Sequence, residues 1–217
     1  VPGVAPGKVL VLGGGVVGSS AIRVALGMGA EVTVLDRSVS RLGELDEQYR
    51  GQLRTVYSTA EAVEEHASEA DLIIGAVLIP GASAPKLITA EMLADIKTGT
   101  VMVDVAIDQG GCFETSRATT HADPTYVVDG VVHYCVANMP GAVARTATMA
   151  LTNATLPYVT RLASDDVGSL LLEDRQFAAG LNIVHGQLTH QAVADALGQT
   201  WTEPDQILRA SLHLKSA

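Results

Sequence analysis

The stretch that decides the fold is VLVLGGGVVGSSAIRVALGMGAEVTVLD, which runs from Val9 to Asp36. Its beginning belongs to a short apolar run over 8–12, as in a parallel strand that is buried on both faces. Glycines then stand at 13, 15 and 18, and the apolar positions 17, 21, 24, 25 and 28 keep a helical spacing up to Gly29. A second apolar run over 31–35 leads into Asp36. The pattern predicts strand, turn, helix and strand, which is the first part of a doubly wound sheet.

The three glycines also carry a chemical prediction. Gly13 permits a tight turn, Gly15 lets the backbone approach a pyrophosphate without a Cβ clash, and Gly18 lets the helix pack closely on the strand. The free N–H groups and the dipole at the start of the helix favour phosphate. Asp36 follows Gly18 by 18 residues, where a carboxylate accepts hydrogen bonds from the ribose hydroxyls of adenosine. The alternative is a glycine-rich turn that holds no dinucleotide.

The choice between NAD and NADP depends on the charges near the end of the second strand. The carboxylate of Asp36 would repel a 2′-phosphate, so the sequence favours NAD. Arg37 and Arg41 weaken this preference, because arginine can hold a 2′-phosphate.

Strands and helices continue to alternate over the first 105 residues, which predicts an α/β fold with a doubly wound Rossmann parallel sheet. The remaining elements of this part are strands over 53–57, 71–76 and 100–105, and helices over 40–49, 60–67 and 89–97, the last with Thr89 as its N-cap. Two more apolar runs, 125–128 and 131–136, could add an edge or final strand.

The pattern changes after Asn138. Apolar residues keep a helical period over about 142–162, and Pro157 should kink or split this helix because proline has no N–H to donate. A polar stretch over 164–174, a strand-like run over 181–184 and a helix over 190–197 follow. We expect a first domain over 1–140 and a partial second domain over 141–217. The second segment is too small to form a stable domain alone.

Composition and charge exclude several classes of protein. Hydrophobic residues make up 47% of the 217 residues, which excludes a disordered chain. The net charge of −10 argues against binding to nucleic acid or to an anionic membrane surface. Glycine and serine interrupt the longest apolar stretches, so no transmembrane helix is expected. Cys112 and Cys135 lack metal-ligand spacing, and a reducing, cytoplasmic location is the simpler interpretation. The chain begins with Val1, and we expect it to come from the middle of a longer protein.

A second motif, VMVDVAIDQGGCFE over 101–114, contains two aspartates. Asp108 falls at or just past the carboxyl end of the fifth strand, where open α/β sheets bind their ligands, and this predicts a place near the nicotinamide. The alternative is that Asp108 caps the turn at 109–111. Asp104 lies inside the strand and is predicted to be structural.

A third motif, AVLIPGASAPK over 76–86, follows the fourth strand. Pro80, Gly81 and Pro85 constrain this loop, which either faces the cofactor or is an ordinary connection. The six histidines are scattered, with no partner at a diagnostic spacing, and are interpreted as structural or surface residues. The sequence shows no zinc-type cluster, so no metal is predicted.

Together these segments resemble the alanine dehydrogenase family. The resemblance rests on 9–36, AVLIPGASAPKLIT, VDVAIDQGGCFETSR, HYCVANMPGAVARTATMALTNATLPYV and GQLTHQAVADALG, and it covers essentially the whole chain. The VAIDQGG and YCVANMPG segments are much more specific than the glycine motif. The α subunit of nicotinamide nucleotide transhydrogenase has similar segments and is the nearest competitor.

The resemblance implies an NAD site at Gly13, Gly15, Val16, Val17, Gly18, Asp36, Arg41, Ser58, Val77, Leu78, Val105, Asn138 and Met139. In it, Asp36 is the acid that binds the ribose, Arg41 is a basic neighbour of the adenosine, and Ser58 lies near the adenine pocket. Val77 and Leu78 pass under the cofactor.

The resemblance also implies a reaction, the NAD-dependent oxidation of L-alanine to pyruvate and ammonia by a homo-oligomer that is typically a hexamer. Asp108 resembles the active-site aspartate beside the nicotinamide, which helps to move protons on the water or carbinolamine intermediate together with a histidine. Asn138 and Met139 resemble residues at the nicotinamide end, where the two domains meet. The long helix from Ala142 would serve dimer contacts.

The chain departs from the family in one large respect. The family builds its substrate domain from a long N-terminal half and the C-terminal tail, and the arginine, lysine and histidine that hold pyruvate lie in the half that this sequence lacks. We therefore expect the 217-residue chain to bind NAD without turning over alanine. The alternatives are a transhydrogenase domain or a non-catalytic NAD-binding module, which would need no acid at Asp108.

Overall fold

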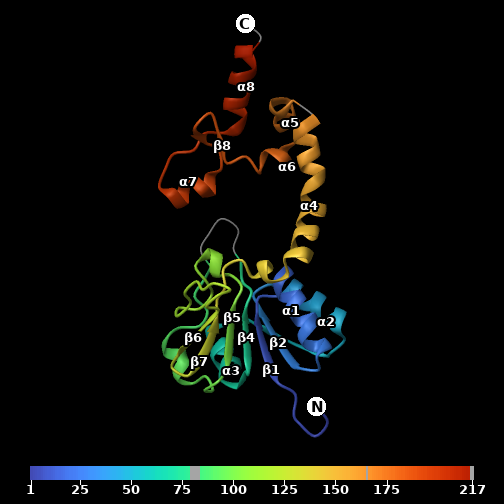
Figure 1. The fold of residues 1–217 in the computed structure, drawn as a ribbon, viewed down its shortest axis with the longest axis vertical. Helices are drawn as coiled ribbons and strands as arrows, with labels where there is room; N and C mark the ends of the chain where they lie inside the picture. Colours follow the sequence, from blue (N-terminus) through green and yellow to red (C-terminus); the bar gives the residue numbers. More distant parts are fainter. Residues whose placement is uncertain (79–83, 165, 216–217) are drawn as a thin grey trace. The chain divides into compact units, whose positions relative to one another are not determined.

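The computed structural model describes residues 1–78, 84–164 and 166–215, with side chains up to 209 (Figure 1). The chain divides into two compact units, Val1–Ala142 and Val143–Ala217. No helix in these described ranges is long and apolar enough to cross a membrane.

The first unit is built on a seven-stranded sheet in the order β3-β2-β1-β4-β5-β7-β6. Every strand pairing is parallel except the one between β6 and β7. The strands are β1 Lys8–Leu12, β2 Glu31–Asp36, β3 Leu53–Tyr57, β4 Leu72–Gly75, β5 Val101–Asp104, β6 Thr125–Val128 and β7 Val131–Tyr134. The predicted strands are thus confirmed, and the two late apolar runs add a parallel strand and an antiparallel edge.

Helices cover both faces of this sheet, as the doubly wound fold requires. They are α1 Val16–Gly27, α2 Val39–Tyr49 and α3 Ala60–Glu69 (Figure 1). Because successive side chains of a strand point to opposite faces, β1 supplies both cores. Val9 and Val11 pack into a cluster with α1 and α2, whereas Leu10 and Leu12 pack into a cluster with α3.

The predicted helix over 89–97 is wrong. Only a short 3-10 helix, η1 Glu91–Ala94, forms there, with Ala90 as its N-cap. The hydroxyl of Thr89 still accepts from the N–H of Met92 at 3.4 Å, which is the contact predicted for a capping residue. Leu93 of this turn is buried, and so is Ile96, which follows it. The carboxylate of Glu114 also binds the N–H of Ala90 at 2.8 Å, which ties the start of the segment to another loop.

The second unit is mostly helical. After the 3-10 helix η3 Met139–Val143, it contains α4 Ala144–Ser164, α5 Val167–Glu173, α6 Arg175–Ala178, β8 Ile183–Val184, β9 Gln187–Leu188, α7 Gln191–Leu197 and α8 Pro204–Lys215. Helix α4 runs unsplit through Pro157. The predicted helix over 190–197 is confirmed, with Gly198 in the left-handed region at its end. Helix α5 lies inside the polar stretch and was not predicted; Asp166 caps it, and Leu170 and Leu171 are buried.

Candidate functional site

The turn between β1 and α1 requires glycine for steric reasons. Gly13 has φ of +98°, and a Cβ there would lie 2.9 Å from the carbonyl oxygen of Ala76. A Cβ on Gly18 would lie 1.8 Å from the carbonyl oxygen of Gly13, so only glycine lets α1 start so close to β1. A Cβ on Gly15 would meet no described atom within 4 Å, which leaves the backbone there open to a ligand. Val16 is exposed and Val17 is more than a third exposed in the first turn of α1.

Asp36 is held in a fixed orientation by two backbone donors. One carboxylate oxygen accepts from the N–H of Gly14 at 2.7 Å, and the other accepts from the N–H of Ser38 at 2.8 Å. Each carboxylate oxygen can accept further hydrogen bonds, so Asp36 keeps acceptor capacity for a diol. The same contacts fix the glycine-rich turn to the end of β2.

Arg41 reaches the glycine-rich turn from α2. Its Nε donates to the carbonyl of Gly14 at 2.8 Å, and its Nη2 donates to the hydroxyl of Ser19 at 2.6 Å. Its Nη1 pairs with Glu44 at 2.5 Å. The guanidinium is thus engaged by the turn, by α1 and by α2. This weakens the alternative in which Arg41 holds a 2′-phosphate.

A pocket of about 210 Å³ lies beside Asp36, at the carboxyl ends of the central strands. Its lining is Gly13, Leu35, Asp36, Arg37, Ser58, Val77, Pro85 and Leu87. Four of these residues (Leu35, Val77, Pro85 and Leu87) are apolar and suit a flat ring, and Asp36 and Ser58 suit a polar sugar. Arg37 also lines the pocket, so the basic side chain that weakens the preference for NAD over NADP remains beside Asp36. The structure therefore brings four of the predicted residues, Gly13, Asp36, Ser58 and Val77, to one cavity.

The other predicted cofactor residues do not line this pocket. Leu78 is exposed, and Val105 is half-buried just past β5, where its N–H donates to the carbonyl of Gly75. Asn138 has a left-handed backbone with φ of +60°, and its carbonyl accepts from Nε2 of His121 at 2.9 Å. Met139 begins η3. Of the loop at 76–86, Pro85 lines the pocket, whereas Pro80 and Gly81 lie outside the described residues.

Asp108 lies where the sequence predicts, just past the carboxyl end of β5. It is exposed in the 3-10 turn η2 Ile107–Gln109. The turn-capping alternative fails, because the N–H groups that Asp108 would cap have other acceptors. Those of Gln109 and Gly111 bind the carbonyl of Ala106, that of Gly110 binds the carbonyl of Ile107, and that of Cys112 binds Asp104.

Asp104 is structural, as predicted. It is fully buried, and its carboxylate accepts from the N–H groups of Ala106 at 3.1 Å and Cys112 at 2.8 Å and from the hydroxyl of Ser116 at 2.5 Å. Cys112 lies next to this carboxylate. Burial, and secondly the charge of Asp104, raises the pKa of the Cys112 thiol to about 11, so it remains protonated. Its Sγ donates to the carbonyl of Val77 at 3.5 Å.

The buried histidine, His133, is also part of the scaffold. It bonds to the hydroxyl of Thr115 at 2.8 Å and to the carbonyl of Val131 at 3.1 Å, and it stacks on Tyr126. Burial lowers the pKa of His133, so its ring is neutral near pH 7. Cys135 and Cys112 are both buried free thiols. Within the described residues, no group of three or more His, Cys, Asp or Glu could hold a metal ion.

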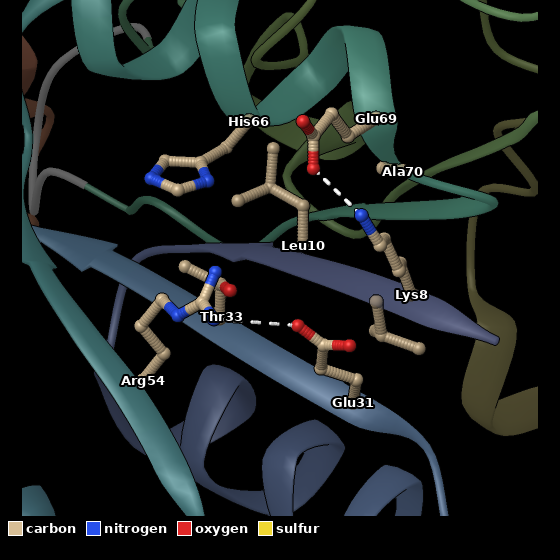
Figure 2. A pocket seen from close by; sticks show the side chains of 9 residues that line it. Lys8, Leu10, Glu31, Thr33, Arg54, His66, Glu69 and Ala70 are labelled. Atoms are coloured by element: carbon tan, nitrogen blue, oxygen red, sulfur yellow. Dashed lines mark hydrogen bonds and ion pairs between the residues drawn. The ribbon is translucent and has the colours of Figure 1, made fainter. Parts of the chain in front are cut away.

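A second, much smaller pocket lies at the opposite, amino end of the sheet (Figure 2). Its volume of about 20 Å³ is enough for a single water. Figure 2 shows its charges paired with one another: Lys8 with Glu69 at 2.7 Å, and Arg54 with Glu31 at 3.5 Å. This pocket lacks the room for a cofactor.

Leu35 and Leu87, which line the pocket, were not predicted as site residues, and neither was Lys86, which lies outside the pocket. The ammonium of Lys86 contacts the carbonyl oxygens of Gly110, Gly111 and Phe113, which belong to the loop after Asp108. The only sequence signal was a basic residue that ends the constrained loop at 76–86, and a single lysine at a loop end does not identify its acceptors.

Comparison with known proteins gives consistent matches. A family profile described as "Alanine dehydrogenase/PNT, C-terminal domain" matches residues 1–191. An alanine dehydrogenase of Halomonas elongata is 65% identical over 208 residues, which are 96% of this chain and 56% of that protein. An alanine dehydrogenase of Mycolicibacterium smegmatis is 51% identical over 208 residues, with the same coverage. The chain thus spans about half the length of the curated relatives it matches.

Solved structures agree with these matches. An L-alanine dehydrogenase superposes with a TM-score of 0.84 at 50% identity, over 91% of this chain and 55% of that one. A transhydrogenase from Sinorhizobium meliloti superposes with a TM-score of 0.69 at 28% identity, over 87% of this chain and 51% of that one.

Proposed function

This chain belongs to the alanine dehydrogenase/PNT C-terminal domain family, and we propose that it is the cofactor-binding portion of an NAD-dependent alanine dehydrogenase. The complete enzyme oxidises L-alanine to pyruvate and ammonia. The observation that carries the proposal is the pocket at the carboxyl ends of the strands, where Asp36 and Ser58 line a cavity together with Gly13, in the turn whose backbone is open at Gly15.

The residues of the first unit suit NAD in two places. The open backbone at Gly15 and the first turn of α1 accept the pyrophosphate, because N–H groups at a helix start favour anions. Asp36 accepts from the adenosine ribose, and the pocket lined by Leu35, Val77 and Leu87 holds the adenine. NAD, when bound, accepts the hydride from the substrate Cα.

Asp108 supplies the acid–base chemistry in this proposal. It stands at the sheet edge where the nicotinamide end of a dinucleotide lies in this fold, and its carboxylate is exposed on a turn that does not need it as a cap. An ionised aspartate there accepts a proton as the substrate carbon is oxidised and water adds. Asn138 and Met139, at the end of the first unit, contribute to the nicotinamide end.

The proposal also covers the substrates, the oligomeric state, the location and the partners of the enzyme. The substrate pair is L-alanine and pyruvate, the complete enzyme is a cytoplasmic homo-oligomer, and neither nucleic acid nor membrane is a partner. We expect the 217-residue chain to bind NADH without turning over alanine, because it spans about half the length of the alanine dehydrogenases that it matches. Alanine-dependent NADH formation by protein of verified 217-residue mass contradicts the last statement.

The test of the proposed function is Asp108→Asn in the complete enzyme carrying this chain. The amide keeps the shape and removes the proton-accepting charge. We expect kcat to fall by about 10²–10⁴, the range for a positioned acid–base group. The Kd for NADH should change by less than about tenfold. A folded variant with near-normal kcat removes Asp108 from the catalytic role.

A transhydrogenase domain is the second candidate, and the 28% identity of the solved transhydrogenase sets it behind the dehydrogenase. A non-catalytic NAD-binding module is the third. A complete protein that binds NADH and leaves alanine unchanged would favour the third over the first.

A further inference from the structure

We propose that Lys86 and Asp104 are positioning residues that hold the loop of Asp108 from two sides, as a clamp. Lys86 binds carbonyl groups of the loop backbone, and Asp104 binds N–H groups of the same loop. This inference rests on the proposed function, because the loop matters for chemistry only if Asp108 does. Neither residue touches the pocket beside Asp36.

The aspartate side of this clamp is buried. The Asp104 carboxylate binds the N–H groups of Cys112 and Phe113, at 2.8 and 3.4 Å, and that of Ala106 at 3.1 Å. These groups stand before and after the turn that carries Asp108. A buried carboxylate is costly unless donors surround it, so the loop must stay wrapped around Asp104.

The lysine side faces the same loop from outside. The ammonium of Lys86 donates to the carbonyls of Gly111 at 2.9 Å and Phe113 at 3.1 Å and also contacts that of Gly110. An ammonium has three donors, and these three carbonyls match that number. The loop is thus drawn toward a positive charge through its oxygens and toward a negative charge through its nitrogens.

The glycines of the motif explain why the loop can adopt this course. Gly110 and Gly111 have φ of +87° and +79°, a left-handed conformation that favours glycine. A Cβ on Gly111 would stand 2.5 Å from a carboxylate oxygen of Asp104. The approach of the loop to Asp104 therefore requires glycine at 111, whereas Gly110 is favoured by its left-handed backbone alone.

Backbone hydrogen bonds tie the Lys86 segment to the same loop. The N–H of Ala84 donates to the carbonyl of Gln109 at 3.0 Å, and that of Leu87 donates to the carbonyl of Cys112 at 2.7 Å. Residues 84–87, which contain Lys86, thus run beside residues 109–112 of the loop after β5. Loss of the Lys86 charge should loosen the turn without opening the core.

The experiment compares Lys86→Met with Lys97→Met in the complete enzyme. Lys97 is a matched control at the other end of the sheet, where its ammonium binds the carbonyl of Glu69 at 2.5 Å and lies 3.4 Å from Asp71. We expect Lys86→Met to lower kcat by about tenfold to a hundredfold, because a small misplacement of a reacting group costs that much. The Kd for NADH should stay within about threefold, a small free-energy difference. Lys97→Met should leave both values unchanged.

Two further measurements separate positioning from a general loss of structure. Lys86→Arg, which keeps the charge, should recover part of the lost kcat. Hydrogen exchange of the peptide that covers 105–116 should be about tenfold faster in Lys86→Met, and unchanged in Lys97→Met, because local opening exposes those amides. Unchanged exchange overturns the clamp. Faster exchange with normal kcat overturns its role in positioning Asp108.

The exchange measurement also keeps this inference apart from the proposed function. If the unmodified enzyme forms no NADH from alanine, the proposed function fails and the positioning role fails with it, while exchange still decides whether the clamp exists. If the unmodified enzyme is active and Lys86→Met loses no more kcat than Lys97→Met, the role of Lys86 in positioning Asp108 is overturned while the proposed function stands.

Discussion

The two units of this chain differ in how they bury apolar surface. The first unit has a core on each side of its sheet, and single strands such as β1 serve both. The second unit buries few of its described side chains, namely Leu170, Leu171, Thr189, Ala194, Ile207 and Leu208. Helix α4, all of which the structure describes, buries none of its 21 residues.

This difference has an energetic meaning. Folding must offset a conformational entropy cost of roughly 1–2 kcal/mol per residue, and burial of apolar surface is the main term that does so. The two buried clusters of the first unit offset this entropy cost without any other part of the protein. The second unit leaves Leu151, Tyr158 and other large apolar side chains of α4 exposed, and a pocket of about 700 Å³ opens between α6, α7 and the start of α8. We infer that the second unit needs further protein surface for stability.

The largest expected effect follows from separating the units. Residues 1–142, expressed alone, should unfold in one cooperative thermal transition, because both cores lie within this range. Residues 143–217, expressed alone, should show no cooperative transition by calorimetry, because they bury too little apolar surface. A sharp transition in the second fragment would break the comparison.

Matched leucine truncations test the same contrast within the intact chain. Leu12 is 0% exposed in β1, and Leu12→Ala should lower the free energy of unfolding by about 2–5 kcal/mol. Leu151 is 65% exposed in α4, and Leu151→Ala should change it by less than about 0.5 kcal/mol. Denaturant titration of both variants gives the two numbers. Equal losses would mean that α4 is covered in solution, for instance by a second copy of the chain.

The same contrast in burial explains what could be predicted from the sequence. Strands of the first unit are buried on both faces, so their apolar runs stand out, and every predicted strand of the sheet is present. The left-handed backbone of Gly13 and the contact of Gly18 with the Gly13 carbonyl are local, and the motif predicted both glycines correctly. In the second unit, α5 was missed because its two buried leucines are adjacent in an otherwise polar stretch and give no period.

Contacts between distant loops could not be predicted from local sequence patterns. The helix predicted over 89–97 has the right apolar residues, but its start is tied to Glu114 and it tightens to a 3-10 turn. The acceptors of Lys86 lie more than 20 residues away, and nothing in the local sequence specifies them. The position of Asp108 at the sheet edge was predictable, whereas the groups that hold its loop were not.

A smaller effect is expected for cofactor binding, which we assign to the first unit. Asp36→Ala should weaken NADH binding by roughly 1–3 kcal/mol, the scale of lost charge-assisted hydrogen bonds. Asp195→Ala, which removes an exposed carboxylate of the second unit, should leave it unchanged. Calorimetric titration measures both. Equal affinities of the unmodified chain for NAD and NADP would contradict the role given to Asp36.

The smallest expected effect is a pH dependence that belongs to the first unit alone. His133 is fully buried, and burial lowers its pKa from the usual value of about 6.5. The unfolded chain therefore binds a proton at a higher pH than the folded chain does. By linkage, the stabilisation is fully present above pH of about 6.5 and is lost as the pH falls toward the folded pKa.

Thermal midpoints measured between pH of about 7.5 and 5.5 should therefore fall with acidity. His133→Gln should flatten this slope, since glutamine does not titrate, even if the variant is less stable at every pH because the stack on Tyr126 is lost. His185→Gln, at an exposed turn of the second unit, should leave the slope as it is. If the slope survives in His133→Gln and disappears in His185→Gln, the second unit contributes cooperatively to the fold, and the contrast drawn between the two units is wrong.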